Sequence, residues 1–463
     1  MKRLAAPLVA LLCTACSLAP DYHRPTVDAP KQFGSRDLFQ KARPADSLPK
    51  GAWWKIYSDK TLNLLEDELG ANQDLKAALS RLQQAQSALK AQRATLFPTV
   101  SAGAVSQKID TSQNKAYYFK SMPTHYQDNL LIADVSYEPD VFGRLANMVA
   151  VSSQQMEASK ADLESLRLSL QAELAADYFT LQSLRVQQRT LKELVENEGE
   201  YLKLTQALLD GGAAPEADVD EAEIALQDAK AQEQDAALQV ATMTHAIALL
   251  LGKPATGFEI PPASDSSPEP WMGTTLPSKL LERRPDIASA ERQVEAANAA
   301  IGIAKAAYFP QFTLNAQGGY ESSQLGNWVS VPSELWSLGA GAVVVLFDAG
   351  QRSALTDKAR EHYEETVASY RQTVLNAYRE VEDSLSAVHR LNLEHASAKH
   401  ALQSARRAAE QAGFRYQGGM ASYLDVVTTQ TQVLQARQQL ALLEGRRMTA
   451  SVLLVKALGG GPR

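Results

Sequence analysis

Two very long segments of this chain carry apolar residues at alternating spacings of three and four positions. The first extends from about Gly143 to Leu209, and the second from about Arg352 to Tyr416. This near-heptad spacing predicts helices that pair side by side as coiled coils and keep charged faces toward water. Each run of about 65 residues corresponds to roughly 100 Å at 1.5 Å per residue. We therefore expect two helices far longer than the average helix of a globular domain.

Segments with a period of two precede each long helix. Apolar and polar residues alternate over 130–137 and 313–318, and Val343–Phe347 is β-branched and aromatic. These patterns predict two strands in each half of the chain, each reaching roughly ten residues, the length of a tilted membrane strand. The loops between paired strands, near Lys108–Asn129 and Glu321–Ser337, contain several aromatic residues. These aromatic residues either pack within the loops or form a girdle at a membrane interface.

The chain reads as two similar halves. Phe97-Pro98 and Phe309-Pro310 each end a helical pattern, 212 positions apart, whereas Gly143 and Gly350 are 207 apart. The first half is therefore five residues longer between its proline and this glycine, which suggests a loop insertion. Each half has the predicted order helix, two strands, very long helix, tight turn, helix. We assign the first structural repeat to residues 61–270 and the second to 271–463.

Each very long helix is predicted to end at a double glycine, 211–212 in one half and 418–419 in the other. Pro215 and Ser422 follow, and these residue types favour the beginning of a helix. Each turn therefore predicts an antiparallel helical hairpin.

The N-terminus has the pattern of a targeting segment. Lys2 and Arg3 precede a short apolar run, which is too short to span a bilayer. Thr14 and Ala15 then stand directly before Cys16, as at a bacterial lipoprotein cleavage site. We predict a signal peptide over 1–15 and a lipidated N-terminal segment over 16–60, with S-diacylglycerol and N-acyl lipid on Cys16 as the only cofactor. The alternative is ordinary cleavage near Ala15, which leaves Cys16 as a free thiol.

Composition excludes several classes of function. The net charge of −7 gives no basic surface for nucleic acid. No glycine-rich phosphate loop occurs, and the four histidines at 362, 389, 395 and 400 lack the spacing of four that places two imidazoles on one metal. We therefore expect no enzyme and no metal site. No segment has about 18 consecutive apolar residues, so a membrane crossing requires closed β-structure.

Four strands cannot close a barrel, because about eight is the practical minimum. Several copies must therefore combine their strands, and three copies supply twelve. The predicted fold is mainly α with β: a long coiled-coil α-helical barrel plus four β-strands per protomer, which complete a 12-stranded transmembrane β-barrel in a homotrimer. Such a barrel holds a water-filled bore, and helices of roughly 100 Å extend this bore beyond a bilayer.

Four segments resemble the outer membrane factor family. They are Cys16–Pro25, Trp53-Trp54, Leu276–Ile287 (LPSKLLERRPDI) and Phe347–Gly350. The chain is most similar to the NodT-like lipoprotein branch, which serves resistance-nodulation-division pumps. The resemblance implies an exit duct anchored in outer-membrane lipid and extending into the periplasm, with a periplasmic membrane fusion (adaptor) protein and an inner-membrane pump as partners.

The resemblance also implies a closed periplasmic tip lined by carboxylates and a Tyr/Arg network. Asp218, Asp425 and Tyr416 match those positions, and three copies of Asp425 would form a negative ring that attracts cations. The alternative is that both aspartates are helix-start carboxylates favoured by the helix dipole. Ala421 and Thr428 replace a basic residue and a second carboxylate that the family often has there, so we expect a tip with fewer contacts.

A second function remains open on the residues alone. A lipoprotein with long paired helices can be a periplasmic tether without a pore, although a tether needs no strands. The exported cargo is not predicted, since a passive bore takes its substrate from its pump. Drugs, solvents, siderophores and metal ions are all compatible.

Overall fold

The computed structural model describes residues 17–26, 51–116, 118–121, 123–261 and 283–460. Within them the helices are α2 (Lys60–Glu68), α3 (Gln73–Ala94), α4 (Arg144–Asp210), α5 (Glu216–Leu250), α6 (Pro285–Ala306), α7 (Gln351–Gln417) and α8 (Tyr423–Ala457). The strands are β1 (Thr99–Asp110), β2 (His125–Tyr137), β3 (Gln311–Ser322) and β4 (Glu334–Val343). Cys16 and most of the segment 16–60 lie outside the described residues, so lipidation stays a prediction.

The duplication predicted from the sequence is present in the helices. α3 and α6 both have 22 residues and begin 212 positions apart, at 73 and 285. α4 and α7 both have 67 residues, and α5 and α8 both have 35. The second member of each of these two pairs begins 207 positions after the first. The predicted order of elements and the five-residue difference are therefore confirmed.

The described residues form two compact units, which divide the chain differently from the two repeats. One contains the four strands and the adjoining helix segments, from Arg81–Lys160 and Ser289–Arg371 together with the described residues before Val27. The other contains the rest of the long helices and the hairpins, within Val27–Ser80, Ala161–Ala288 and Gln372–Arg463. The predicted segment boundaries at 60/61 and 270/271 stay predictions.

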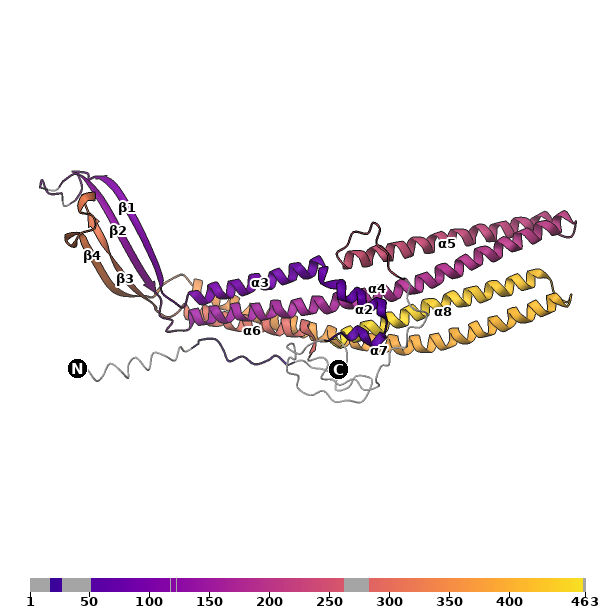
Figure 1. The fold of residues 1–463 in the computed structure, drawn as a ribbon. Helices are drawn as coiled ribbons and strands as arrows, with labels where there is room; N and C mark the ends of the chain where they lie inside the picture. Colours follow the sequence, from indigo (N-terminus) through magenta and orange to yellow (C-terminus); the bar gives the residue numbers. More distant parts are fainter. Residues whose placement is uncertain (1–16, 27–50, 117, 122, 262–282, 461–463) are drawn as a thin grey trace. The chain divides into compact units, whose positions relative to one another are not determined.

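The strands form one antiparallel sheet in the order β1-β2-β3-β4 and lie side by side in Figure 1. They have 12, 13, 12 and 10 residues, which confirms the predicted length. The two loops are shorter than predicted, because the strands continue to Asp110 and Ser322. The assignment of Val343–Phe347 to a strand was wrong beyond its first residue, since β4 ends at Val343.

The register places the apolar residues on one face of the sheet. Val135 pairs with Ala316, which in turn pairs with Leu338. Because side chains alternate between faces, the residues between them share the opposite face. There Asp134 pairs with Gln317, whose Oε1 accepts a hydrogen bond from Ser337. The sheet therefore has one apolar and one polar face, as the alternation in the sequence predicted.

The second unit has its hydrophobic core where α2 meets α4. Tyr57 is fully buried and contacts Phe179 edge-on at 5.0 Å between ring centroids. Buried Tyr178 donates a hydrogen bond to Asp59 over 2.8 Å, which satisfies both polar groups. Trp53 joins this cluster. The Trp-Trp pair singled out in the sequence is thus part of the core.

Two antiparallel hairpins extend from this core, α4–α5 and α7–α8 (Figure 1). Gly212 and Gly419 end the long helices with φ of +71° and +70°, a conformation that glycine adopts without a steric penalty. Both predicted turns are confirmed. Among the described helices, none is both long enough and apolar enough to cross a membrane.

Candidate functional site

The tip of the α7–α8 hairpin is organised by a capping box. The Ser422 hydroxyl accepts a hydrogen bond from the Asp425 amide over 3.2 Å, and the Asp425 carboxylate accepts from the Ser422 amide over 2.9 Å. Two amides that lack partners within the helix are thereby satisfied. The hydrogen bonds from Ser422, with a smaller contribution from the Arg415 charge, lower the pKa of Asp425. Asp425 is exposed and ionised at neutral pH, and its helix-start role is established by this geometry.

Tyr416 lies beside this cap without joining it. Its ring contacts Tyr423, with centroids 5.3 Å apart, and the side chain is 42% exposed. Arg415 donates to the Met420 carbonyl over 3.4 Å across the turn. Within the described chain, no hydrogen bond joins Tyr416 to Asp425. At this tip Arg415 is therefore bonded to the turn and Tyr416 packs on Tyr423, and neither side chain is hydrogen-bonded to the carboxylate in the described chain.

The tip of the α4–α5 hairpin is built differently. Pro215 occupies the cap position and makes no side-chain capping bond. Asp218 is the third residue after it, equivalent to Asp425, and is exposed. Its amide donates to the Pro215 carbonyl over 3.2 Å. Asp218 and Asp425 thus hold equivalent positions, but among the described residues no hydrogen bond or ion pair links them.

The C-terminal end of the second helix of each hairpin, α5 or α8, contacts the beginning of another helix. In the first repeat, the Asn72 amide donates to the Leu250 carbonyl at the end of α5 over 2.8 Å. In the second, the Arg284 guanidinium donates to the Ala457 carbonyl at the end of α8 over 3.0 Å. We call these two junctions the roots of the hairpins. In the sequence, Arg284 stands within the motif Leu276–Ile287, and its equivalence to position 72, 212 residues earlier, is the signal that indicates its role.

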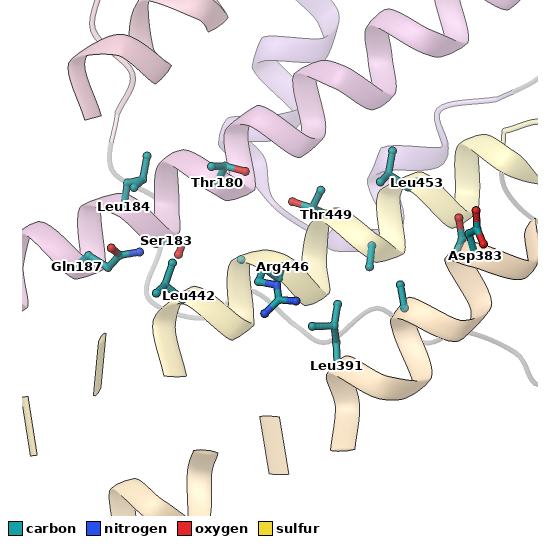
Figure 2. A pocket seen from close by; sticks show the side chains of 14 residues that line it. Thr180, Ser183, Leu184, Gln187, Asp383, Leu391, Leu442, Arg446, Thr449 and Leu453 are labelled. Atoms are coloured by element: carbon teal, nitrogen blue, oxygen red, sulfur yellow. The ribbon is translucent and has the colours of Figure 1, made fainter. Parts of the chain in front are cut away.

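A groove lies between α4, α7 and α8 next to the second root, and Figure 2 shows the side chains that line it. Its volume is about 460 Å³. Its walls are mainly apolar, from Leu184, Leu391, Leu442 and Leu453, and Asp383 and Arg446 add one charge of each sign. This groove can accommodate apolar side chains. Across the described part of the chain, no group of three or more His, Cys, Asp or Glu residues is placed to hold a metal ion.

The family model for outer membrane efflux proteins matches residues 64–253 and 276–460. The chain belongs to this family. The resemblance seen in the sequence motifs is thereby confirmed, and the two matched segments fall one in each repeat. The model describes efflux proteins, which favours the duct over the alternative of a tether without a pore.

Individual relatives of this outer membrane efflux protein match along its whole length. It is 30% identical to the pyoverdine export outer membrane protein OpmQ of Pseudomonas aeruginosa, over 100% of this chain and 97% of that protein. It is 29% identical to the cation efflux system protein CusC of Escherichia coli, over 98% of each chain. The solved outer-membrane channel OprN superposes with a TM-score of 0.85 at 28% identity, covering 96% of this chain and 99% of that one. The helical channel fold with its four-stranded sheet is therefore shown.

Proposed function

We propose that this efflux protein is a passive exit duct assembled as a homotrimer. In this assembly the four strands of each copy complete a 12-stranded barrel in the outer membrane, and the paired helices continue the bore into the periplasm. A periplasmic adaptor protein and an inner-membrane resistance-nodulation-division pump deliver the cargo. The relatives are named for different cargoes, pyoverdine and cations, so membership of the family leaves the cargo open.

The sheet is the single observation that carries the proposal. β1 and β4 are its edge strands, and neither is paired on its outer side by another described strand. Backbone N–H and C=O groups left unpaired in lipid cost several kcal/mol each. The apolar face formed by Val135, Ala316 and Leu338 suits a lipid contact. Pairing β4 of one copy with β1 of the next removes both edges at once.

A helix in the other unit supports the same assembly. α5 exposes three large apolar side chains, Ile224, Leu238 and Leu249, with exposed fractions of 61%, 64% and 75%. These side chains are available for contact with another chain. In the proposed trimer a second copy of this chain covers them.

Anchoring through lipid on Cys16 is part of the proposal. The residue after it, Ser17, donates a hydrogen bond to Asn147 in the first turn of α4 over 2.9 Å. Further along, Arg24 forms an ion pair with Glu291 at 3.1 Å and donates to the Tyr370 hydroxyl over 3.0 Å. These contacts hold the described segment 17–26 against its helices, so the acyl chains would enter the membrane at a fixed place.

The gate assigned to Asp425, Asp218 and Tyr416 is proposed at the hairpin tips. Three ionised Asp425 carboxylates around a threefold axis would attract cations and exclude anions. The low pKa of Asp425 favours this role, since the charge persists through the neutral range. Asp218 and Tyr416, on the neighbouring tip segments, would complete a narrow ring.

The decisive experiment is conductance of the purified, full-length protein in a planar bilayer, with its mass measured in detergent. We expect a trimer and a mostly closed channel that divalent cations block. Asp425→Asn is the informative variant, because Asn retains an acceptor for the cap and loses only the charge. It should weaken the block, and Asp218→Asn should do so less.

A monomer that gives no current would overturn the proposed duct. A trimer whose block by cations is unchanged in Asp425→Asn would remove the gate assignment alone. Lipidation is tested separately by the mass of the N-terminal peptide, with Cys16→Ala as the control that lacks the acyl mass.

A further inference from the structure

The two roots share one backbone design. Gly252 follows α5 and Gly459 follows α8, 207 positions apart, with φ of +66° and +78°. A Cβ on Gly252 would lie 2.7 Å from the Ala71 carbonyl oxygen. A Cβ on Gly459 would lie 3.0 Å from the backbone of Arg283. The chain after α5 therefore packs directly on the backbone just before α3, and the chain after α8 packs on the backbone just before α6.

The side chain that bridges the first root is neutral. Asn72 is buried and uses its carboxamide in both directions. Its oxygen accepts from the amides of Asp74 and Leu75, over 2.8 and 3.1 Å, and thereby caps α3. Its nitrogen donates to Leu250, as described above. The first root thus joins α3 and α5 through a neutral side chain. The ion pair beside it, between Lys253 and Glu68 at 2.6 Å, links the chain after α5 to α2 and not to α4.

The side chain at the equivalent place in the second root is a buried cation. Arg284 donates to both carboxylate oxygens of Asp286, over 3.1 and 2.7 Å, and to Ala457. The same guanidinium forms an ion pair with Glu380 on α7 at 2.8 Å. Burial lowers the pKa of Arg284, but the two carboxylates outweigh this effect and the pKa is raised. The second root therefore joins three elements, α6, α7 and α8, through a permanent charge.

The contact with α7 has no counterpart among the described residues of the first repeat. The position equivalent to Glu380 is Glu173 on α4, which is exposed. Asn72, with its short neutral side chain, offers no charge to pair with a carboxylate. Conversely, Glu380 lies one turn before Asp383, and Ala457 one turn after Leu453, which are two residues of the groove lining. Arg284 therefore ties α7 to α8 where the groove ends.

We propose that Arg284 is the positioning residue of the α7–α8 hairpin, fixing the separation of the two helices at their root by pairing with Glu380 while it bonds Ala457. We call this pair of contacts the lock, and among the described residues the α4–α5 hairpin has no equivalent of it. Because α8 carries Asp425 at its other end, the root also sets where the proposed gate stands. That last step rests on the proposed function, whereas the lock itself does not.

The test compares equivalent substitutions in the two repeats of the full-length protein in detergent. Glu380→Gln removes the charge on α7 and leaves the bonds of Arg284 to Asp286 and Ala457 in place. Glu173→Gln is the matched control in the first repeat. Spin labels on exposed positions of α7 and α8, at Leu393 and Gln439, report the separation of the helices. We expect a broader distance distribution in Glu380→Gln and the wild-type distribution in Glu173→Gln.

Salt distinguishes an ion-paired lock from simple packing. Glu380 is 42% exposed, so high salt screens its attraction to Arg284. Raising the salt concentration should broaden the wild-type distribution toward that of Glu380→Gln and should leave the variant unchanged. Arg284→Asn, which copies the first root, should in addition accelerate amide exchange in the last turn of α8 by about tenfold, as expected when a hydrogen bond to a charged group is lost.

An unchanged distance distribution in Glu380→Gln, together with no response of the wild type to salt, would overturn the proposal. If Arg284→Asn fails to fold, Glu380→Gln still decides the question, because its side chain is partly exposed. The spin-label distances and the amide exchange are measured independently of channel conductance. Loss of conductance or of gating would therefore count against the proposed function and not against the lock.

Discussion

Helices α5 and α8 are copies of one element, yet they bury different residues. Leu238 on α5 is 64% exposed. The equivalent residue on α8 is Gly445, which is buried where α8 crosses α4. There the Ser183 hydroxyl donates to the Ala441 carbonyl over 2.8 Å, and a Cβ on Gly445 would lie 2.7 Å from the Ser183 Cβ. The helices that surround α5 and α8 therefore determine which residue type each duplicated position can hold.

The same difference separates the two hairpins as a whole. α8 packs against both α4 and α7, and Leu443 and Ala450 form a buried cluster with Leu391 of α7. α5 buries Leu226 and Ala229 and leaves the face with Leu238 open. The two hairpins therefore differ in how closely the shorter helix of each, α5 or α8, packs on its neighbours.

Among the substitutions, the largest effect on stability is expected when the residue found on α5 is placed at the equivalent position of α8. Gly445→Leu introduces a side chain where even a methyl group would overlap Ser183. The helix must shift, and overpacking of this kind costs about 3 kcal/mol. The midpoint of denaturant unfolding, followed by helical circular dichroism, should fall accordingly. A variant as stable as the wild type would show that α8 does not pack on α4 at this point.

The reverse exchange, Leu238→Gly, sharpens the comparison. On an exposed helix face it costs only about 1 kcal/mol, from the loss of helix propensity. If a second copy covers Leu238, truncation of a buried leucine adds roughly 2 kcal/mol or more. The two outcomes distinguish a free α5 from one that is buried in the proposed trimer.

Most of the helical architecture could be predicted from the sequence, because glycine and proline mark its boundaries. The predicted ends of the long helices, Leu209 and Tyr416, differ from the observed ones by one residue. β4 was harder to predict. Its sequence contains glycines and alanines of low strand propensity, and it is a strand because it pairs with β3. The more β-branched run after it lacks such a partner among the described strands.

The candidate site was predicted less completely. Asp425 is a local feature, and its helix-start alternative follows directly from Ser422 three residues before it. Arg284 acts through Glu380 and Ala457, which are distant in the sequence and meet it only in the folded chain. The crossing at Gly445 likewise depends on α4. Contacts between helices that do not follow one another in the chain cannot be read from periodicity.

An effect that accumulates with pH is expected from Glu66, whose equivalent in the second repeat is Ser278. The Glu66 carboxylate is buried on α2 with no hydrogen-bond partner in the described chain. Burial, with a smaller contribution from Asp67, raises the pKa of Glu66 from 4.5 to about 9. The folded state then holds a proton that the unfolded state releases above pH 4.5. The free energy of unfolding should therefore fall as pH rises toward 9, by about 1.4 kcal/mol per pH unit.

Glu66→Gln tests this assignment, because it removes the titration and retains the shape. Unfolding by denaturant at several pH values between 5 and 9 should show a smaller slope in the variant than in the wild type. Equal slopes would contradict the raised pKa of Glu66.

The smallest effect concerns the two tips. Ser422→Ala removes the hydroxyl that accepts the Asp425 amide, and loss of an N-cap side chain costs about 1 kcal/mol. Amide exchange in the first turn of α8 should accelerate accordingly. Pro215→Ala is the matched change in the first repeat, where the cap residue makes no side-chain capping bond, and it should alter exchange in α5 less. Equal acceleration at both tips would contradict the idea that only the second hairpin has a side-chain cap. Acceleration at the second tip alone would mean that Asp425 takes part in holding its turn together as well as carrying a charge. Asp425→Asn, which keeps the cap and removes the charge, is then the variant that separates a gate from a cap.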